Sequence, residues 1–219
     1  MGMCAGEKVP DRSSVDAMHS CWSCKGPVAA RALFCSICGV VQPPGQIDHF
    51  ARLGLQRTFD INRADLDRQY FGFQRRLHPD RFVMRSPKER ALSQQQATAV
   101  NEAYEILRDP LRRADYLLHL MGRNSGEERG RPADPDLLME MMERREELAE
   151  ASGADAVNAL AARAEADVTA CQNDIGKAFA DSDPDRAESL TARLKYLVRL
   201  LEETRLRKRR IDAEKNTGR

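Results

Sequence analysis

Apolar residues recur every three or four positions along most of this chain, which is the spacing of one face of an α-helix. The pattern is clearest over residues 62–77, where the apolar positions are Leu66, Tyr70, Phe73 and Leu77. Asn62 is a good N-cap for this helix, because its side chain can accept hydrogen bonds from the first free backbone N–H groups. His78 precedes a proline and is therefore disfavoured in helical geometry, so we expect the helix to end there.

The same periodicity, interrupted by proline, glycine and aspartate, predicts further helices on both sides. They are expected over residues 48–55, 86–108, 110–121, 135–150, 154–180 and 184–211. Pro87 and Pro110 each follow a capping residue and suit the first helical position. The last three helices are amphipathic and joined by short connections, which favours an antiparallel three-helix bundle.

Segments without periodicity divide the chain into parts. Residues 1–20 and 212–219 are predicted to be disordered tails. Residues 123–133 are polar and rich in helix breakers, which indicates an interdomain linker. The folded parts are then expected over residues 21–42, 46–122 and 134–211, and strands are expected only in the first of these.

Composition excludes several classes of protein. The 219 residues carry 35 Lys and Arg against 34 Asp and Glu, so the whole chain exerts little electrostatic attraction on nucleic acid or membrane. No apolar run approaches the ~18 residues of a membrane span. The N-terminus lacks an apolar signal core and carries Glu7, Asp11 and Asp16, which argues against export and against a transit peptide. We therefore expect a location in the bacterial cytoplasm, with the mitochondrial matrix as the alternative.

Four of the six cysteines form two C-x-x-C pairs: Cys21, Cys24, Cys35 and Cys38. In a chain without an export signal, paired C-x-x-C motifs are typical of metal ligands rather than of disulfides. Four thiolates complete a tetrahedron, so we predict one structural zinc ion, with iron or redox dithiols as alternatives. Cys171 lies on the apolar stripe of its helix and is expected in the core, whereas Cys4 is incidental.

The tripeptide His78-Pro79-Asp80 forms a turn between two predicted helices. A His and an Asp two residues apart could transfer a proton, but no nucleophile or pocket-forming sheet is predicted beside them. A simple helix-capping turn is a second interpretation. The third is a docking device, which the surrounding arginines favour: exposed arginines steer association, and Pro79 fixes one backbone dihedral in advance.

These residues resemble the J domain, a family whose functional motif is a His-Pro-Asp turn. The resemblance rests on Arg75-Arg76-Leu77-His78-Pro79-Asp80-Arg81-Phe82 and on Val100-Asn101-Glu102-Ala103-Tyr104-Glu105-Ile106-Leu107-Arg108-Asp109-Pro110. J domains bind DnaK-class chaperones and stimulate their ATPase activity when substrate is present. The resemblance implies that the chaperone contacts are His78, Pro79, Asp80, Arg68, Arg75, Arg76 and Arg81.

Two further segments are similar to the HscB family, the J-type co-chaperones of iron–sulfur cluster assembly. They are Arg112-Arg113-Ala114-Asp115-Tyr116-Leu117-Leu118 and residues 134–148. A tetracysteine module is known in the eukaryotic branch of that family. The resemblance implies that the C-terminal bundle binds an IscU-type scaffold protein through Leu138, Met139, Met142, Glu143, Glu146, Glu150 and Tyr196. Arg144 and Tyr196 differ from the leucine and phenylalanine common in the family.

The helix predicted over residues 135–150 independently indicates such a surface. At about 100° per residue, Leu137, Met141 and Leu148 share a narrow arc that can face the bundle. Leu138 and Met142 lie on another arc beside carboxylates, where adaptable apolar side chains and charges can bind a partner. The alternative is that both residues only widen the core face.

The sequence thus predicts an all-α protein: a J-domain helical hairpin and an antiparallel three-helix bundle in an L-shaped pair, preceded by a small zinc-binding hairpin module. It would be a co-chaperone for a DnaK or HscA-class ATPase and an IscU-type scaffold, and not an enzyme. The alternatives are a general J protein for unfolded clients, or a nucleic-acid-binding zinc-ribbon protein. The latter would use Arg205, Arg207, Lys208, Arg209 and Arg210.

Overall fold

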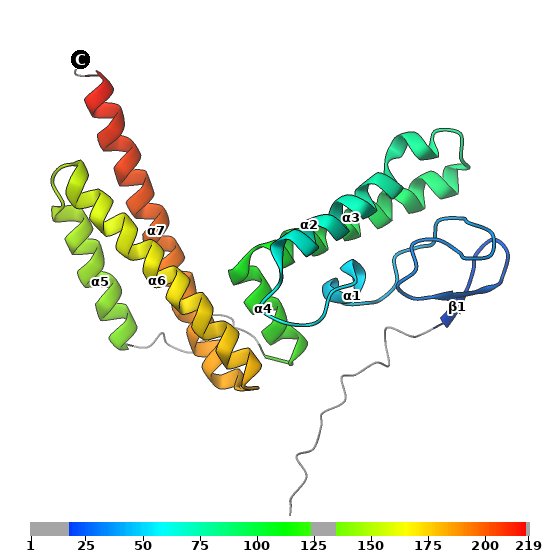
Figure 1. Cartoon of the computed structure of the whole chain (residues 1–219), viewed down its shortest axis with the longest axis horizontal. Coiled ribbons are helices and arrows are strands. Elements are labelled where there is room, and N and C mark those ends of the chain that lie inside the picture. Colours follow the sequence, from blue (N-terminus) through cyan, green and yellow to red (C-terminus); the bar gives the residue numbers. More distant parts are fainter. Residues whose placement is uncertain (1–17, 124–134, 218–219) are drawn as a thin grey trace, which may run out of the picture. The chain divides into compact units, whose positions relative to one another are not determined.

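The structure, a computed structural model, describes residues 18–123 and 135–217, without the side chains of residues 212 and 214–217. It is predominantly helical, as predicted (Figure 1). Its elements are β1 (Met18–Ser20), β2 (Pro27–Ala29), α1 (His49–Leu53), α2 (Arg63–Leu77), the 3-10 helix η1 (Pro79–Phe82), α3 (Pro87–Arg108), α4 (Pro110–Leu120), α5 (Pro135–Glu150), α6 (Ala154–Ala180) and α7 (Pro184–Thr217). Within the described ranges, no helix combines the length and apolar character needed to cross a bilayer.

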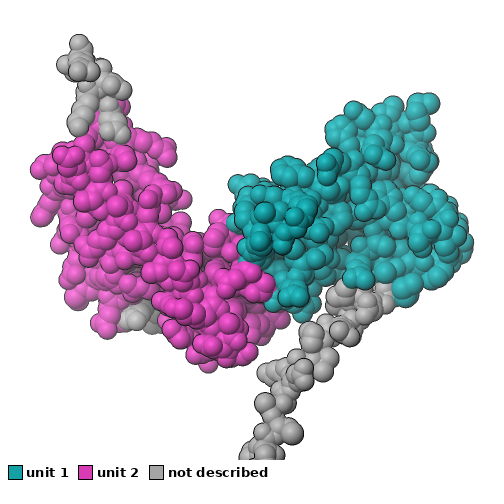
Figure 2. Space-filling view, viewed as in Figure 1, with its two compact units in different colours: residues 1–57, 61–108 teal, residues 58–60, 109–219 magenta. Residues whose placement is uncertain are grey.

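The described residues form two compact units, coloured separately in Figure 2. The first unit contains residues 18–57 and 61–108, which are the cysteine-rich segment, α1, α2, η1 and α3. The second unit contains residues 58–60 and the chain from residue 109 onward, which includes α4 to α7. Helix α4 thus packs with the C-terminal helices, chiefly with α7, although the sequence pattern grouped it with the helices before it.

Helix α2 begins and ends where local chemistry predicts. The Oδ1 atom of Asn62 accepts hydrogen bonds from the backbone N–H groups of Ala64 at 2.9 Å and Asp65 at 3.3 Å. At the other end, His78 leaves helical geometry with ψ near 132° because Pro79 follows it. Helix α3 starts with a capping box, in which Ser86 and Glu89 each accept from the other's backbone N–H.

The core of the first unit lies between α1, α2 and α3. Side chains on all three helices are buried: Phe50, Leu53, Leu66, Leu77, Leu92, Val100, Ala103 and Leu107. A two-stranded antiparallel sheet pairs Met18 with Ala29 and Ser20 with Pro27. The strand β1 begins at Met18, within the stretch expected to be disordered, because pairing with β2 extends the cysteine-rich module toward the N-terminus.

The second unit is built mainly on the contact between α6 and α7. The apolar stripe of α6 meets that of α7, and buried members of the two stripes are Val157, Ala164, Val168, Cys171, Ile175, Leu194, Leu197 and Leu201. Cys171 is a core residue, as expected, and burial raises the pKa of its thiol to about 11. Phe59 stacks on Phe179 with ring centroids 5.9 Å apart, which attaches residues 58–60 to this unit.

Helix α7 continues to Thr217, past the end expected near residue 211. Two features explain the difference: Ile211 is buried, and no glycine or proline interrupts the sequence before Gly218. The other expectations about the termini and the linker, including Cys4, fall mostly on residues outside the described ranges.

Candidate functional site

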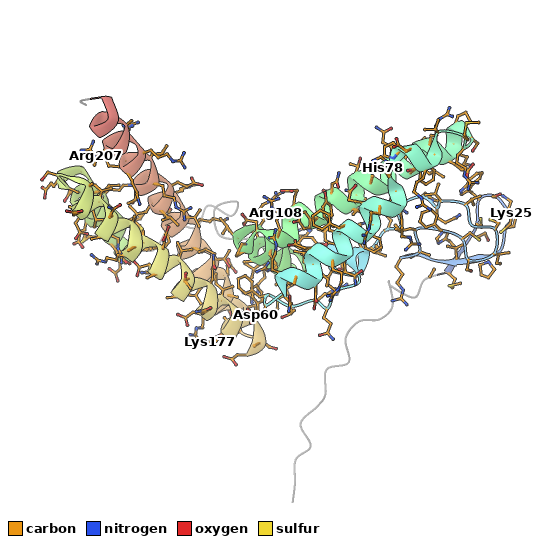
Figure 3. All side chains as sticks on the ribbon, turned by 45° about the horizontal axis from the view of Figure 1, so that its top comes forward. Lys25, Asp60, His78, Arg108, Lys177 and Arg207 are labelled. Carbon is orange, nitrogen blue, oxygen red and sulfur yellow. The ribbon has the colours of Figure 1, made fainter. Side chains whose placement is uncertain are left out.

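The His-Pro-Asp turn lies at the end of α2 and is exposed, with 58% of the His78 side chain and 85% of the Asp80 side chain accessible. Figure 3 labels His78 in the first unit. The backbone N–H of Asp80 donates to Nδ1 of His78 at 3.3 Å, and the N–H of Arg81 donates to the carbonyl of His78 at 3.0 Å. Oδ2 of Asp80 also lies 3.5 Å from Nδ1 of His78. The turn therefore presents a preorganised imidazole and a carboxylate to solvent.

Below the turn, one buried residue of η1 connects this surface to the core. Phe82 is 7% exposed, whereas Val83 and Met84 after it are 61% and 94% exposed. The hydroxyl of Ser93 on α3 donates to the carbonyl of Leu77, the last residue of α2, at 3.1 Å. The short helix η1 was not predicted from the sequence. Its buried Phe82 and the bond from Ser93 to Leu77 together hold the turn against α3.

A second candidate surface is an apolar strip on α5, formed by Leu138, Met139 and Met142. These side chains are 40%, 64% and 63% exposed. Their neighbours Leu137 and Met141 are buried, so the helix separates a core face from a solvent face as its periodicity predicts. Large apolar side chains exposed together on one helix mark a binding surface more often than isolated ones do.

Carboxylates flank this α5 strip. Glu143, Glu146 and Glu150 are exposed, and within the described residues none of them forms an ion pair. Other charges of α5 are engaged in holding the helix: Arg145 pairs with Glu203 of α7 at 2.9 Å. The acids beside the strip are therefore available to a basic partner.

Tyr196 lies on α7, the helix against which α5 packs, and is partly buried. Arg144, at the position where the HscB family commonly has leucine, points its guanidinium into a charged cluster on the bundle. It pairs with Glu140 at 2.9 Å and with Asp167 of α6. These acids raise the pKa of Arg144 against the opposing effect of burial. Arg144 therefore attaches α5 to α6 and adds no apolar surface to the strip.

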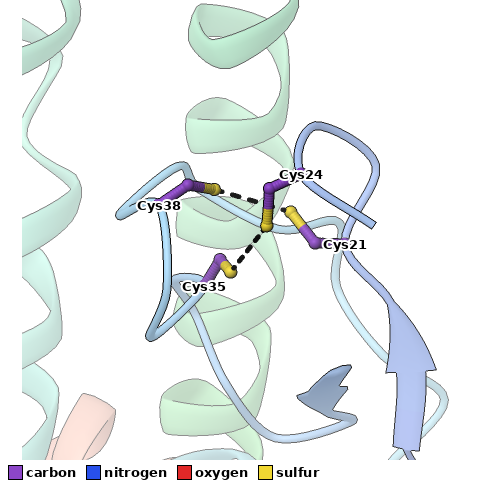
Figure 4. Close-up of side chains that lie close together, drawn as sticks. All are labelled: Cys21, Cys24, Cys35 and Cys38. Atoms are coloured by element: carbon purple, nitrogen blue, oxygen red, sulfur yellow. Dashed lines mark hydrogen bonds between the residues drawn. The ribbon is translucent and has the colours of Figure 1, made fainter. Parts of the chain in front are cut away.

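The third candidate site is the cysteine cluster, drawn in Figure 4. The four sulfur atoms of Cys21, Cys24, Cys35 and Cys38 lie within 4.8 Å of one another. Two of the distances between them are 3.7 Å, from Cys21 to Cys38, and 3.6 Å, from Cys24 to Cys35. A tetrahedral ion with bonds of about 2.3 Å to sulfur would require edges of about 3.8 Å. The arrangement therefore fits a four-coordinate metal ion.

Each pair of cysteines is held by a turn that folds the chain back. In the first turn Lys25 takes a left-handed conformation with φ 64°, and in the second Gly39 does so with φ 75°. The glycine after Lys25 has a different role, because a Cβ on Gly26 would lie 2.4 Å from Cδ1 of Ile37. A larger residue there would require the Ile37 side chain to move.

The cysteine thiols differ in pKa because their surroundings differ. Burial raises the pKa of Cys21, but backbone N–H groups of Cys24 and Ser23 donate to it and bring the pKa to about 6. The N–H of Cys38 likewise lowers the pKa of Cys35. The N–H of Gly26 favours the thiolate of Cys24, but burial and the other three cysteines raise the pKa of Cys24 to about 12. Cys21 and Cys35 thus favour the negatively charged thiolate form, which is the form that binds a metal ion.

The chain matches known proteins in both units. The DnaJ domain family model matches residues 48–116, and the model of the HSCB C-terminal oligomerisation domain matches residues 133–205. Iron-sulfur cluster co-chaperone protein HscB of Mus musculus is 33% identical over 192 residues, which cover 86% of this chain and 82% of that protein. A co-chaperone protein HscB homolog of Burkholderia mallei is 43% identical over 112 residues, or 51% of this chain and 64% of that protein.

A solved structure agrees with these matches. The crystal structure of human co-chaperone protein HscB is similar with a TM-score of 0.80 and 32% sequence identity, covering 86% of this chain and 98% of that chain. The chain belongs to the HscB family of iron–sulfur cluster co-chaperones. The predicted family and the predicted fold class are confirmed.

Within this HscB-family chain, the arginines beside the turn differ in their surroundings. Arg68 pairs with Asp65 on the same helix, and Arg76 lies over the ring of Phe34 at 4.9 Å from its centroid. Arg75 and Arg81 are exposed, and no ion pair or ring contact to either is found in the described part of the chain. Of the four arginines assigned to the chaperone contact, Arg75 and Arg81 are therefore the two that no other side chain engages within the described residues.

Contacts between the cysteine module and the α2–α3 hairpin were not predicted from the sequence. Lys88 of α3 lies over the ring of Trp22, with Nζ 4.2 Å from the centroid. Gln96 of α3 donates through Nε2 to the carbonyl of Gln42 at 2.9 Å. No local pattern identifies these residues, since Gln42 and Gln96 are 54 positions apart.

Proposed function

We propose that this protein is a co-chaperone that binds a DnaK or HscA-class chaperone, of the heat shock protein 70 family, and stimulates its ATPase activity. The observation that supports this most directly is the exposed and preorganised turn at His78, Pro79 and Asp80 in a chain of the HscB family. Arg75 and Arg81 beside the turn would attract an acidic surface of the chaperone and raise the association rate. Arg68 and Arg76 would contribute less, because other side chains already engage them.

We propose that the second unit binds an IscU-type scaffold protein on the α5 strip. Leu138, Met139 and Met142 would supply the desolvated centre of the interface, and methionines adapt to an irregular partner surface. The carboxylates of Glu143, Glu146 and Glu150, which form no ion pair among the described residues, would orient a scaffold with basic residues around its apolar contact. Tyr196 would add an aromatic edge to this surface.

We propose that the cysteine cluster holds one zinc ion with a structural role. The spacing of the sulfur atoms suits the bond length of zinc to thiolate, and four thiolates leave no open position for a substrate. Iron in the same tetrahedron is the alternative. The ion would supply no chemistry beyond cross-linking residues 21–38.

In this proposal the protein makes and breaks no covalent bond. It brings a cluster scaffold to an ATPase and couples the binding of the scaffold to ATP hydrolysis, which promotes cluster assembly and transfer. We propose the bacterial cytoplasm as its location, with the mitochondrial matrix as the alternative, because relatives come from both bacteria and eukaryotes.

A single-turnover ATPase assay tests this function against that of a general J protein. The chaperone is mixed with this protein alone, with scaffold alone, with both, and with an unfolded polypeptide in place of the scaffold. We expect scaffold and protein together to stimulate hydrolysis more than the product of their separate effects, and we expect no binding of this protein to the unfolded polypeptide. Direct binding to the unfolded polypeptide without binding to the scaffold would instead establish the general J protein.

A further inference from the structure

Three buried polar side chains connect the cysteine cluster to the His-Pro-Asp turn. Gln42 is fully buried, Gln96 is 2% exposed and Ser93 is 3% exposed. All three belong to the first unit, and neither the helix pattern nor the proposed function accounts for them. Buried polar groups in a small core are costly unless their hydrogen bonds are satisfied, so their contacts show what they hold in place.

The contacts follow one another from the metal ligand to the turn. Nε2 of Gln42 donates to the sulfur atom of Cys21 at 3.3 Å and to the carbonyl of Val40 at 3.0 Å. The backbone carbonyl of Gln42 accepts from Nε2 of Gln96 at 2.9 Å. Ser93 lies about one helical turn before Gln96 on the same face of α3. Its hydroxyl donates to the carbonyl of Leu77 at 3.1 Å, and the next residue is His78.

The hydrogen bond to Leu77 replaces one that the turn itself removes. In a continuing helix the carbonyl of Leu77 would accept from the N–H of Arg81. That N–H instead donates to the carbonyl of His78 at 3.0 Å, because Pro79 redirects the chain. Ser93 therefore caps the last buried carbonyl before the turn and ties the end of α2 to α3.

Two contacts between a cation and an aromatic ring join the cysteine module to α2 and α3, one on each side of the turn. Arg76, two residues before His78, lies over Phe34, the residue before the ligand Cys35. Lys88, at the start of α3, lies over Trp22, the residue after the ligand Cys21. Each contact pairs one cysteine turn with one helix end, so disorder in the cysteine turns would release both ends of the hairpin.

We propose that occupancy of the metal site controls the order of the His-Pro-Asp turn, with Gln42 and Gln96 as positioning residues. A metal ion fixes both cysteine turns, and with them the position of the Cys21 sulfur atom that accepts from Nε2 of Gln42. Loss of the ion weakens the hydrogen bond between Gln42 and Cys21 and then the bond from Gln96 to Gln42. The restraint that Ser93 places on the end of α2 weakens last. The effect of the metal on the turn does not depend on the proposed function. Only its consequence does: if the turn binds the chaperone, that contact depends on the metal.

The amide oxygens of the two glutamines support this transmission. Oε1 of Gln42 and Oε1 of Gln96 are buried, and neither has a hydrogen-bond partner in the part of the chain that the structure describes. Gln96 is therefore oriented through its Nε2 group, which donates to the backbone carbonyl of Gln42. The orientation of Gln96 thus depends on where the cysteine module places the backbone of Gln42.

Hydrogen exchange measured by mass spectrometry tests the proposal on the full-length protein without any partner. Exchange of the Asp80, Arg81 and Phe82 amides is compared in zinc-loaded and chelator-treated protein, for the wild type, Gln96→Ala and the matched control Gln95→Ala. Gln95 is the exposed neighbour of Gln96 on α3. We expect zinc removal to accelerate exchange at these amides by about fivefold or more in the wild type and in Gln95→Ala, the factor for one buried hydrogen bond. In Gln96→Ala we expect fast exchange already with zinc bound and little further change on its removal.

Two results would overturn the proposal. One is unchanged exchange at the turn in wild-type protein that has lost its zinc. The other is a full response to zinc removal in Gln96→Ala, which would show that the effect does not pass through Gln96. Peptides from α1 and from the first half of α2, which belong to the same unit as Gln96, report whether a variant remains folded, and Ser93→Ala provides the same comparison if Gln96→Ala does not fold. Because the measurement needs no chaperone, its outcome is independent of whether the protein stimulates an ATPase.

Discussion

The two candidate binding surfaces of this protein are built in different ways. The His-Pro-Asp turn is a backbone structure, and hydrogen bonds from its own residues and from Ser93 hold it in one conformation. The α5 strip is a set of side chains on a regular helix, and its most exposed members are flexible methionines. Loss of a single interacting group can therefore inactivate the turn. The strip instead loses affinity in smaller steps as its apolar side chains are truncated.

The charges around the two surfaces also differ. The turn is flanked by Arg75 and Arg81, and the strip by Glu143, Glu146 and Glu150. Surfaces of opposite charge on one chain favour partners of opposite charge and discourage each partner from binding at the wrong site. Four experiments test whether the two surfaces act independently, and the one that should change the protein most is given first.

Removal of the metal should affect the two surfaces very differently. Chelation should unfold the cysteine module, because a structural zinc site contributes on the order of 10 kcal/mol to the folding of a small module. Scaffold binding through the α5 strip should stay within about twofold, since these residues lie in another unit. Metal content by mass spectrometry and scaffold binding by calorimetry check both parts. A Cys24→Ser/Cys35→Ser variant that retains one zinc ion per chain would contradict the assigned ligands.

Replacing the imidazole of the turn should nearly abolish ATPase stimulation. We expect His78→Gln to reduce single-turnover stimulation by about thirtyfold, the factor for loss of a central interface residue. Scaffold binding should not change. His119→Gln, a matched change at an exposed histidine at the end of α4, should have no effect on stimulation. Equal stimulation by His78→Gln and wild type would rule out the turn as the chaperone contact.

Truncation of the strip should weaken scaffold binding without affecting the chaperone contact. We expect Leu138→Ala/Met142→Ala to lower scaffold affinity by about tenfold, with smaller effects of each single change. The control is Leu120→Ala/Met121→Ala, which removes an exposed Leu and Met from the end of α4. If both double variants bind the scaffold equally well, the strip is not the scaffold site.

Neutralising one free arginine should have the smallest effect. We expect Arg75→Ala to slow chaperone association by about threefold at low salt and to have little effect at high salt, where exposed charges are screened. Arg209→Ala on α7 is the matched control for a lost surface charge. Stopped-flow association at two salt concentrations measures the difference. An effect of Arg75→Ala that is independent of salt would mean that Arg75 acts through packing instead.

Much of the fold followed from local rules, because helices depend on residues three or four positions apart. The caps at Asn62 and Ser86 and the proline at position 79 placed α2, the turn and α3 correctly. The burial of Leu137 and the exposure of Leu138 also follow from helical geometry alone. The residues assigned to chaperone and scaffold binding remain predictions that the experiments above test.

Other features depend on segments that are distant in the chain. Helix α4 was grouped with the helices before it, yet it packs on α7, and the stacking of Phe59 on Phe179 has no local signal. The contact of Arg76 with the ring of Phe34 likewise has no local signal. Such contacts depend on how whole faces fit together, which periodicity does not specify.

The helices, the grouping of the four cysteines, the exposed turn and the apolar strip all follow from the sequence, since each depends on chemistry within a few residues. Only the tertiary structure placed Gln42 between Cys21 and Gln96, and Ser93 on the carbonyl before His78. The physical reason is that a buried hydrogen bond between distant residues is selected by packing, which leaves one donor and one acceptor facing each other away from water.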